Sequence, residues 1–360
     1  MSKPGSRTNE LLVHDAAGRR WLRFANPESV ISADRACDVL PALAEVERAI
    51  NSRGLWAAGF ISYEAAPAFD RALKVREPGH LPLLWFGLYR APEPAAPPAA
   101  AAPGEVPPIA WAPTLARESY DAAIADIRER IRRGETYQVN YSFRLRALFQ
   151  ADPLALFRRM SAAQKADYCA FADTGRFVLC SASPELFFRL DGRTLISKPM
   201  KGTAPRGLTL EADRAEAESL RNSEKNQAEN VMIVDMVRND MSRVAERDTV
   251  RALRLFDVER YPTLWQMTST VECRSAAPLA DVFAALFPCA SITGAPKPKT
   301  MEIIALLETT PRGIYTGAIG FAGPGRRAQF NVAIRTVTVD RERGLAEYGV
   351  GGGILWDSTA

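Results

Sequence analysis

Histidine and cysteine are scarce in this chain. Among its 360 residues the only histidines are His14 and His80, and the five cysteines are scattered without a Cys-x-x-Cys pair. Two histidines give little basis for a histidine-ligated metal site or for a Ser-His-Asp hydrolase. Five isolated cysteines indicate neither a disulfide framework nor a zinc site, so we expect a reducing, cytoplasmic location.

Long apolar runs are missing as well. No apolar stretch reaches 18 residues, and the opening MSKPGSRTNELLVHD has no signal-peptide core. Charge of either sign does not dominate, because 46 basic residues face 42 acidic ones and the net charge is only +4. We therefore predict a soluble protein that binds neither membrane nor nucleic acid, and a small anionic substrate fits this balance.

A Pro/Ala-rich stretch, APEPAAPPAAAAPGEVPP at residues 91–108, divides the sequence. Proline has no backbone N–H to donate to a sheet, so this stretch predicts an extended linker. Residues 1–90 before it form an N-terminal segment with one expected helix at 33–50 and a strand within 55–65. Residues 109–360 form a larger domain that contains most of the candidate functional residues.

The larger domain shows both helix and strand patterns. We expect helices at residues 119–135, 208–222, 223–244 and 299–308, a strand at 136–149, a hairpin at 176–200, and strands at 314–323, 328–340 and 346–356. Because the two patterns do not alternate strictly, they favour an α+β fold with antiparallel sheets over a doubly wound parallel fold.

Two carboxylates lie in the predicted helix at 223–244. Its segment 231–237 is apolar on every side, which predicts a buried helix. Asp235 has Arg238 three residues on, so a structural ion pair explains it. Glu229 has only apolar residues at the corresponding positions. Magnesium commonly binds one or two carboxylates together with substrate oxygens and waters, so Glu229 is a candidate magnesium ligand.

The hairpin at 176–200 brings an acid and an amine together. A two-residue loop places Glu185 opposite Lys198. Such a pair is either a cross-strand ion pair or an acid and a nucleophile whose pKa values are tuned by burial. A second amine, Lys201 in KPMKGTAPRG, follows Pro199, where we expect the strand pairing to end.

Two further features offer contacts to an anion. Gly351, Gly352 and Gly353 end a strand and expose backbone N–H groups, although a bulge or a flexible strand end explains them equally well. Arg335, predicted in the middle of an apolar strand, needs an anionic partner, which is either a side chain or a ligand carboxylate.

Eight motifs occur in order along the chain: GETYQVNY (134–141), SPELF (183–187), PMKGT (199–203), EKNQAENVMIVDMVRND (224–240), ITGAPK (292–297), YTGAIGF (315–321), NVAIRT (331–336) and GGGI (351–354). This set resembles the chorismate-using enzymes. The family includes component I of aminodeoxychorismate synthase and of anthranilate synthase, and the isochorismate and salicylate synthases. The resemblance covers about residues 115–357, and is weaker in GFISYEAAPAFD (59–70).

Two positions discriminate between the activities of this family. The isochorismate and salicylate synthases of this family carry a lysine base where this sequence has Gln138, and a glutamine cannot take a proton from water, so the resemblance implies that hydroxyl addition does not occur here. Anthranilate synthases usually have Pro-Ile-Ala-Gly-Thr where this chain has PMKGT. The lysine form resembles aminodeoxychorismate synthase, in which Lys201 is implied as a covalent nucleophile.

The resemblance implies a fold of two β-sheets packed orthogonally with helices outside. It implies that chorismate and ammonia are converted to 4-amino-4-deoxychorismate for 4-aminobenzoate and folate synthesis, with ammonia from a separate glutaminase subunit. Glu185 is implied as general acid and Glu229 as ligand of Mg²⁺. The implied substrate-binding residues are Tyr315, Arg335, Gly202, Thr203, Gly351, Gly352 and Gly353.

Two other functions stay open on this reading. The first is that of anthranilate synthase component I, which adds ammonia at C2 and needs no lysine nucleophile. The second is that of a catalytically silent ligand-binding subunit. The resemblance also implies an acidic helix after the Gly351–Gly353 motif that carries a second magnesium carboxylate. The sequence ends at Ala360 before such a helix, so we expect a chain truncated at its C-terminus, or the front part of a fusion, with Asp357 as the nearest acid.

Overall fold

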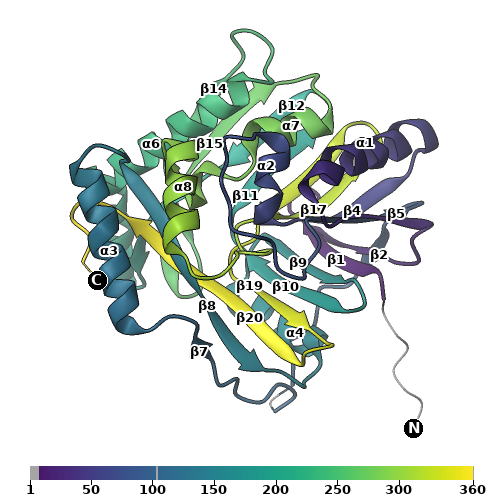
Figure 1. Cartoon of the computed structure of the whole chain (residues 1–360), viewed down its shortest axis with the longest axis horizontal. Coiled ribbons are helices and arrows are strands. Elements are labelled where there is room, and N and C mark those ends of the chain that lie inside the picture. Colours follow the sequence, from purple (N-terminus) through teal and green to yellow (C-terminus); the bar gives the residue numbers. More distant parts are fainter. Residues whose placement is uncertain (1–7, 103, 360) are drawn as a thin grey trace.

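The computed structural model describes residues 8–102 and 104–359 (Figure 1). The helices of these residues are α1 (Ala36–Arg53), α2 (Ala66–Phe69), α3 (Arg117–Arg132), α4 (Pro153–Gln164), α5 (Leu210–Asn222), α6 (Glu224–Ser242), α7 (Leu279–Leu286) and α8 (Lys297–Leu307), with short 3-10 helices at Tyr63–Ala65 and Ala290–Ile292.

The strands are β1 (Glu10–Asp15), β2 (Arg20–Phe24), β3 (Ser29–Ala33), β4 (Trp56–Ile61), β5 (Leu84–Tyr89), β6 (Glu93–Ala95), β7 (Ala112–Pro113), β8 (Gln138–Leu148), β9 (Tyr168–Asp173), β10 (Phe177–Ser183), β11 (Leu186–Asp191), β12 (Thr194–Lys198), β13 (Met200–Pro205), β14 (Arg251–Arg260), β15 (Leu264–Arg274), β16 (Gly294–Ala295), β17 (Ala318–Gly323), β18 (Arg327–Val332), β19 (Thr336–Asp340) and β20 (Leu345–Ile354).

These strands form two ten-stranded sheets. The first sheet has the order β16-β8-β20-β19-β10-β9-β1-β2-β6, with β7 beside β8, and the second has the order β13-β15-β12-β11-β18-β17-β4-β5-β3, with β14 beside β15. Neighbouring strands pair antiparallel, as for β8 with β20 and β11 with β18. The α+β class predicted from the sequence is therefore confirmed.

Apolar side chains from both sheets meet in a shared core. Leu11 and Phe24 of the first sheet pack in one buried cluster with Phe60 and Trp85 of the second. Helix α1 covers β3 and β5 of the second sheet, and α4 covers β9 and β10 of the first. Each sheet therefore packs one face against the other sheet and the opposite face against helices. Its apolar side chains are removed from water on both faces, which favours this layered arrangement.

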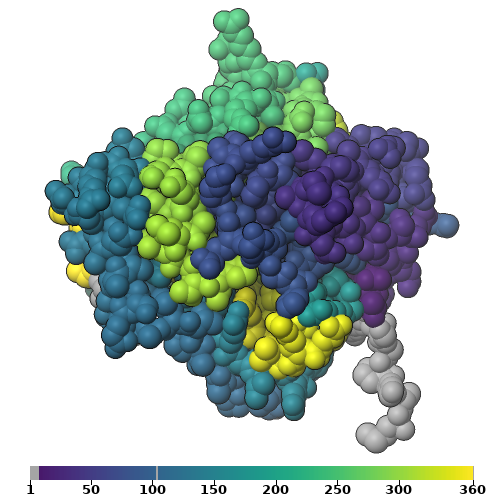
Figure 2. Space-filling view, in the orientation of Figure 1, coloured from purple at the N-terminus to yellow at the C-terminus, as the bar shows by residue number. Residues whose placement is uncertain are grey.

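Both sheets contain strands from before and from after the Pro/Ala-rich stretch. Strand β1 pairs with β9, and β4 pairs with β17, so residues before 91–108 share both sheets with residues after it. In Figure 2 residues 8–90, in purple and blue, lie against the later segments across one continuous surface. The division into 1–90, 91–108 and 109–360 stays a prediction. The expectation that the Pro/Ala-rich stretch cannot pair with a strand was wrong, because β6 lies within it and pairs with β2. Strand β6 lies at the edge of the first sheet, where a strand donates backbone hydrogen bonds on one side only.

Two of the points at which the chain passes from one sheet to the other lie side by side. Strand β10 belongs to the first sheet and β11 to the second, and only Pro184 and Glu185 connect them. The return passage links β18 to β19, so the single strand predicted at 328–340 is in fact two strands in different sheets. Arg335 does not lie in mid-strand, as expected, but between these strands with φ of 50°.

Helix α6 is less buried than its sequence predicted. Ile233, Val234 and Val237 are buried, whereas Val231 is 39% exposed and faces solvent. Asp235 is exposed and forms the expected ion pair with Arg238, at 2.8 Å. The sequence of α6 at 231–237 is apolar on every side because its exposed face, as well as its buried face, carries apolar residues. No helix in the described residues is long and apolar enough to cross a membrane.

Candidate active site

A cleft of about 370 Å³ opens between edges of the two sheets. On one side lies β13, the edge strand of the second sheet. On the other lies β20, whose pairing with β19 stops at Tyr348 while its pairing with β8 continues to Ile354. Beyond Tyr348, no described strand pairs with the edge of β20 that faces away from β8. Backbone N–H groups on such an edge are available to an anion.

The cleft brings together most of the residues predicted for the site. It is lined by nine of them: Glu185, Lys201, Gly202, Thr203, Tyr315, Arg335, Gly351, Gly352 and Gly353. These residues come from five segments that are distant in the sequence. Glu229 is the predicted site residue that does not line the cleft.

Glu185 lies where the chain passes from β10 to β11. Two backbone hydrogen bonds join the segment between β10 and β11 to the segment between β18 and β19. Val332 N–H donates to the Glu185 carbonyl and Ala182 N–H donates to the Arg335 carbonyl, each at 3.0 Å. The Glu185 side chain is 3% exposed, and its carboxyl accepts a hydrogen bond from Ser291 Oγ at 2.5 Å. Burial raises the pKa of this carboxyl to about 7, although Ser291 and the Lys201 amine act against the shift.

Lys201, and not Lys198, is the amine that faces Glu185. A register shift in β11 puts Leu186 opposite Lys198, whose amine forms an ion pair with Glu259. The strand pairing also continues past Pro199, because β13 pairs with β15. Both expectations from simple hairpin register were therefore wrong. Lys201 lies at a second register shift, between Met200 and Thr203, which turns it toward the cleft.

The neighbourhood of Lys201 favours its neutral amine. Burial lowers the pKa of this amine, and the carboxylates of Glu185 and Glu229 oppose that effect. The next residue, Gly202, has φ of 93°, and a Cβ there would lie 3.1 Å from Asn226 of α6. Glycine at 202 therefore permits both the backbone conformation and the close approach of α6 behind the lysine.

Gly353 leaves room for two side chains. A Cβ at this position would lie 2.2 Å from Gln138 Nε2 and 3.2 Å from Lys201 Nζ. The amide of Gln138 and the amine of Lys201 therefore lie side by side against bare backbone. The glycines at the end of β20 thus have a packing role at Gly353, beyond the flexible strand end considered from the sequence.

Tyr315 and Arg335 line the wall near the passages between the sheets. Tyr315 is buried and its ring lies 4.8 Å from the Arg144 guanidinium. Burial raises the pKa of its phenol, which therefore stays a neutral O–H donor. Arg335 donates a hydrogen bond to the side chain of Gln164. The anionic partner expected for Arg335 is thus not a carboxylate of the described residues, and its guanidinium can serve a ligand carboxylate.

Glu229 lies behind Lys201 on α6. It is half-buried, and burial raises the pKa of its carboxyl, with the amines of Lys201 and Lys225 opposing the shift and Asp357 adding to it. Within the described residues Glu229 has no hydrogen-bond or ion-pair partner, whereas Asp357 pairs with Lys225 at 2.6 Å. An unpaired carboxylate of this kind fits a divalent cation better than a structural role.

The described residues do not form a complete metal cage on their own. No three His, Cys, Asp or Glu side chains in residues 8–102 and 104–359 gather closely enough to hold a metal ion. Any magnesium at Glu229 would therefore take most of its ligands from substrate oxygens and water, which is common for this ion.

Several residues of the cleft were missed from the sequence. Asn140, Gln266, Ser291 and Tyr348 also line it. Ser291 directly precedes the ITGAPK motif and Asn140 lies inside GETYQVNY, so position within a motif was the available signal. Among the described residues, neither the buried Nδ2 of Asn140 nor the buried Oε1 of Gln138 has a hydrogen-bond partner. Buried polar atoms of this kind usually have a partner, which in a cleft can be a ligand.

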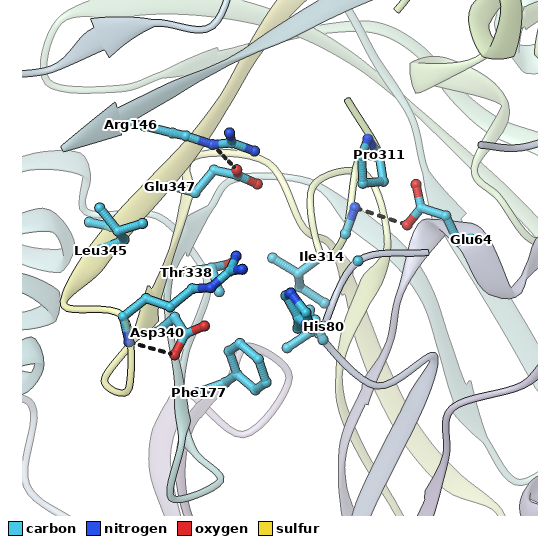
Figure 3. Close-up of a pocket in the computed structure, with 15 residues that line it drawn as sticks. Glu64, His80, Arg146, Phe177, Pro311, Ile314, Thr338, Asp340, Leu345 and Glu347 are labelled. Carbon is cyan, nitrogen blue, oxygen red and sulfur yellow. Dashed lines mark hydrogen bonds and ion pairs between the residues drawn. The ribbon is translucent and has the colours of Figure 1, made fainter. Parts of the chain in front are cut away.

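A second cavity, of about 170 Å³, lies away from Lys201 and Glu185 (Figure 3). It has Glu64 and His80 on one side and Arg146 and Glu347 on the other. Two of these charges already form an ion pair, since Arg146 lies 2.7 Å from Glu347. The cleft with its facing acid and amine is therefore the stronger candidate for chemistry.

Comparison with known proteins agrees with this geometry. A family model described as chorismate binding enzyme matches residues 8–360. The chain belongs to this family. It is 43% identical over 244 residues to the aminodeoxychorismate synthase of Streptomyces griseus, and 41% identical over 246 residues to an anthranilate synthase component 1 of Haloarcula marismortui.

The alignments cover 66% and 67% of this chain, but only 33% and 50% of those two relatives, so the matched part spans at most half of either protein. The crystal structure of anthranilate synthase component I from Streptococcus pneumoniae TIGR4 has a TM-score of 0.80, with 23% identity, 100% coverage of this chain and 90% of that one. This likeness confirms the fold predicted for the chorismate-binding chain.

Proposed function

We propose that this chain converts chorismate and ammonia to 4-amino-4-deoxychorismate, as component I of an aminodeoxychorismate synthase. The observation that carries the proposal is the Lys201 amine, which faces the buried carboxyl of Glu185 in one cleft. The lowered pKa of the amine favours the nucleophilic, neutral form of Lys201, and the raised pKa of the carboxyl keeps part of Glu185 protonated near neutral pH.

In the first step Lys201 Nζ attacks C2 of the substrate ring. The two ring double bonds shift, the C4–O bond breaks, and Glu185 gives its proton to the departing hydroxyl, which leaves as water. Ammonia then attacks C4, the double bonds shift back, and the C2–N bond to Lys201 breaks, which frees the amine. The ammonium group formed at C4 gives up one proton, which restores the acid form of Glu185. Gln138 lies beside Lys201 but has no basic group, so it does not activate water for attack on the ring.

The anionic groups of the substrate need fixed partners. Tyr315 and Arg335 would hold the pyruvyl carboxylate, and backbone N–H groups of β13 and β20 would hold the ring carboxylate. Glu229 would hold Mg²⁺, which supplies positive charge against the substrate carboxylate when bound. Ammonia would come from a glutaminase partner, and relatives named component 1 fit an enzyme with a second component.

The test is a product assay on the intact chain. The protein is incubated with chorismate, Mg²⁺ and ammonium at alkaline pH, and the products are separated and then treated with aminodeoxychorismate lyase. We expect a product that this lyase turns into 4-aminobenzoate. Anthranilate as the main product would assign the chain to the other branch. Binding of chorismate without turnover would indicate a silent ligand-binding subunit.

Glu229→Gln should weaken the response to magnesium. The amide keeps the shape of the side chain but removes the charge that attracts the cation, so the Mg²⁺ concentration for half-maximal rate should rise about tenfold or more. Asp235→Asn on the exposed side of α6 is the matched control and should leave this concentration unchanged. An unchanged Mg²⁺ titration for Glu229→Gln would show that this carboxylate is not a ligand.

A further inference from the structure

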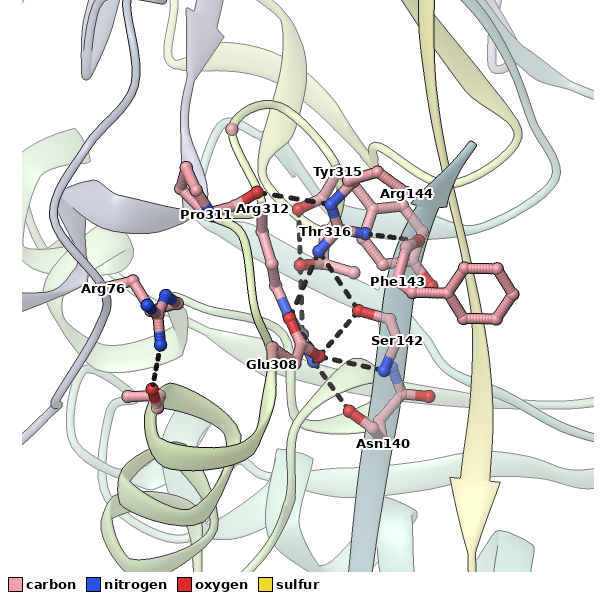
Figure 4. A network of polar contacts seen from close by, with 12 residues as sticks. Arg76, Asn140, Ser142, Phe143, Arg144, Glu308, Pro311, Arg312, Tyr315 and Thr316 are labelled. Atoms are coloured by element: carbon pink, nitrogen blue, oxygen red, sulfur yellow. Dashed lines mark hydrogen bonds and ion pairs between the residues drawn. The ribbon is translucent and has the colours of Figure 1, made fainter. Parts of the chain in front are cut away.

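A buried ionic cluster lies directly behind the cleft wall (Figure 4). Glu308 pairs with Arg312 at 2.6 Å and with Arg144 at 3.2 Å, and all three side chains are at most 2% exposed. Neither arginine nor Glu308 lines the cleft or takes part in the proposed chemistry. Burying three charges is costly, so a stabilising role alone explains them poorly.

The Arg312 guanidinium holds three separate segments of the wall. It donates to the carbonyl of Asn140 at 2.7 Å, to the carbonyl of Ile292 at 3.0 Å, and to Thr316 Oγ1 at 3.2 Å. Asn140 and Ile292 line the cleft themselves, and Thr316 follows the cleft residue Tyr315. The Nε and Nη2 groups of Arg312 also donate hydrogen bonds to the Glu308 carboxylate, at 3.1 and 2.6 Å.

The segment at Tyr315 needs such support. Thr316 has φ of 64°, a backbone conformation that β-branched residues rarely adopt. Its hydroxyl donates to the Tyr315 carbonyl and accepts from Arg312. The Tyr315 ring lies 5.9 Å from the Arg312 guanidinium and 4.8 Å from that of Arg144. Strain of this kind persists where surrounding contacts determine the geometry.

The N-terminal segment supports the same residue from the other side. Both oxygens of the buried Glu64 carboxyl accept backbone hydrogen bonds, from Arg312 N–H at 2.6 Å and from Gly313 N–H at 2.9 Å. The ring of Tyr63 lies 4.6 Å from the Arg312 guanidinium. The weakly matching motif GFISYEAAPAFD therefore has a structural connection to the cleft through these two residues.

We propose that Arg312 is a positioning residue that fixes Asn140 and Tyr315 in the substrate cleft, and that Glu64 fixes Arg312 from the N-terminal segment. The inference rests on the proposed function only in taking the cleft as the chorismate site. Lysine cannot replace this arginine, because one ammonium cannot reach the Glu308 carboxylate and three wall segments in a planar arrangement.

The test compares Arg312→Lys with Arg341→Lys. Arg341 is a suitable control because it also makes two hydrogen bonds, both at 2.7 Å, to a buried carboxylate, that of Asp173, and lies outside the cleft. For Arg312→Lys we expect KM for chorismate to rise tenfold or more while kcat falls less. For Arg341→Lys we expect a lower melting temperature with both constants within about twofold of wild type.

Hydrogen exchange gives a readout that does not depend on turnover. Arg312→Lys should speed exchange in peptides covering residues 138–142 and 311–318, and Arg341→Lys should not. This measurement can be made even if the wild-type protein makes no 4-amino-4-deoxychorismate. Failure of the proposed function can therefore be distinguished from failure of the positioning role. Wild-type KM together with unchanged exchange in these peptides would overturn the positioning role.

A second variant covers the case in which Arg312→Lys does not fold. Glu64→Gln leaves the Arg312 side chain intact and weakens only the contacts to its backbone. We expect faster exchange at residues 311–318 and a rise in KM of about threefold or more, with kcat close to wild type. Exchange and KM equal to wild type in this variant would overturn the role of Glu64.

Discussion

Replacing Lys201 with alanine is expected to reduce formation of 4-amino-4-deoxychorismate by on the order of a thousandfold. The variant lacks the amine that attacks C2 and displaces the 4-hydroxyl, so the covalent route is lost. The substrate contacts predicted at Tyr315, Arg335 and the β20 edge remain, so chorismate should still bind. Product formation by chromatography and chorismate binding by calorimetry measure the two effects separately.

Lys198→Ala is the matched control for this variant. Lys198 ends β12, just before the strand that carries Lys201, but it pairs with Glu259 and does not line the cleft. We expect it to retain turnover. Wild-type rates for Lys201→Ala would refute the nucleophile assignment, and a large loss for Lys198→Ala alone would move that assignment to Lys198.

Any residual product of Lys201→Ala has an expected identity. The variant sequence becomes Pro-Met-Ala-Gly-Thr, which is close to the form usual in anthranilate synthases. With no amine at C2, ammonia can attack that carbon directly. We therefore expect the remaining activity to shift toward anthranilate, which its fluorescence detects.

Glu185→Gln is expected to lower turnover more than tenfold while substrate binding persists. Glutamine retains the shape and can accept the hydrogen bond from Ser291, but it has no acidic proton for the departing hydroxyl. Ser291→Ala is a useful companion because it removes that hydrogen bond and keeps the acid. A Glu185→Gln rate above about a tenth of wild type, a loss under ~1.4 kcal/mol, would exclude the general-acid role.

The pH dependence of turnover tests the same group. Burial raises the pKa of Glu185 to about 7, so the acid is protonated below this pH and loses its proton above it. With rates corrected for the concentration of free ammonia, wild-type turnover should fall as pH rises through about 7. The Glu185→Gln variant should lack this fall. Because deprotonation of the Lys201 amine acts in the opposite direction in both proteins, the comparison isolates Glu185, and identical pH profiles for wild type and Glu185→Gln would contradict the assignment.

Local patterns in the sequence determined much of the secondary structure and the identity of the site residues. Apolar periodicity gave α1, α3, α5, β8 and β20 close to their observed bounds, whereas β9, β14 and β15 were not predicted. Side-chain chemistry and motif spelling selected Glu185, Lys201, Tyr315 and Arg335 before their proximity was known. These features depend on nearby residues and on chemical type, which a sequence carries directly.

Pairing over long distances was decided only by the tertiary structure. The segment 328–340 alternates like one strand, yet β18 and β19 belong to different sheets, and no local pattern marks a change of sheet at Arg335. The shift in β11 moved Lys198 away from Glu185 for a similar reason, since a bulge depends on packing against strands distant in sequence.

The sequence by itself therefore determined the α+β class and the family, and it suggested the acid and two candidate amines for the site. The tertiary structure decided which lysine faces the acid and how the wall is supported. Arg312 illustrates the difference. Its partners Glu64, Asn140 and Ile292 lie far from it in the chain, and a buried charge reveals its role only when those partners surround it.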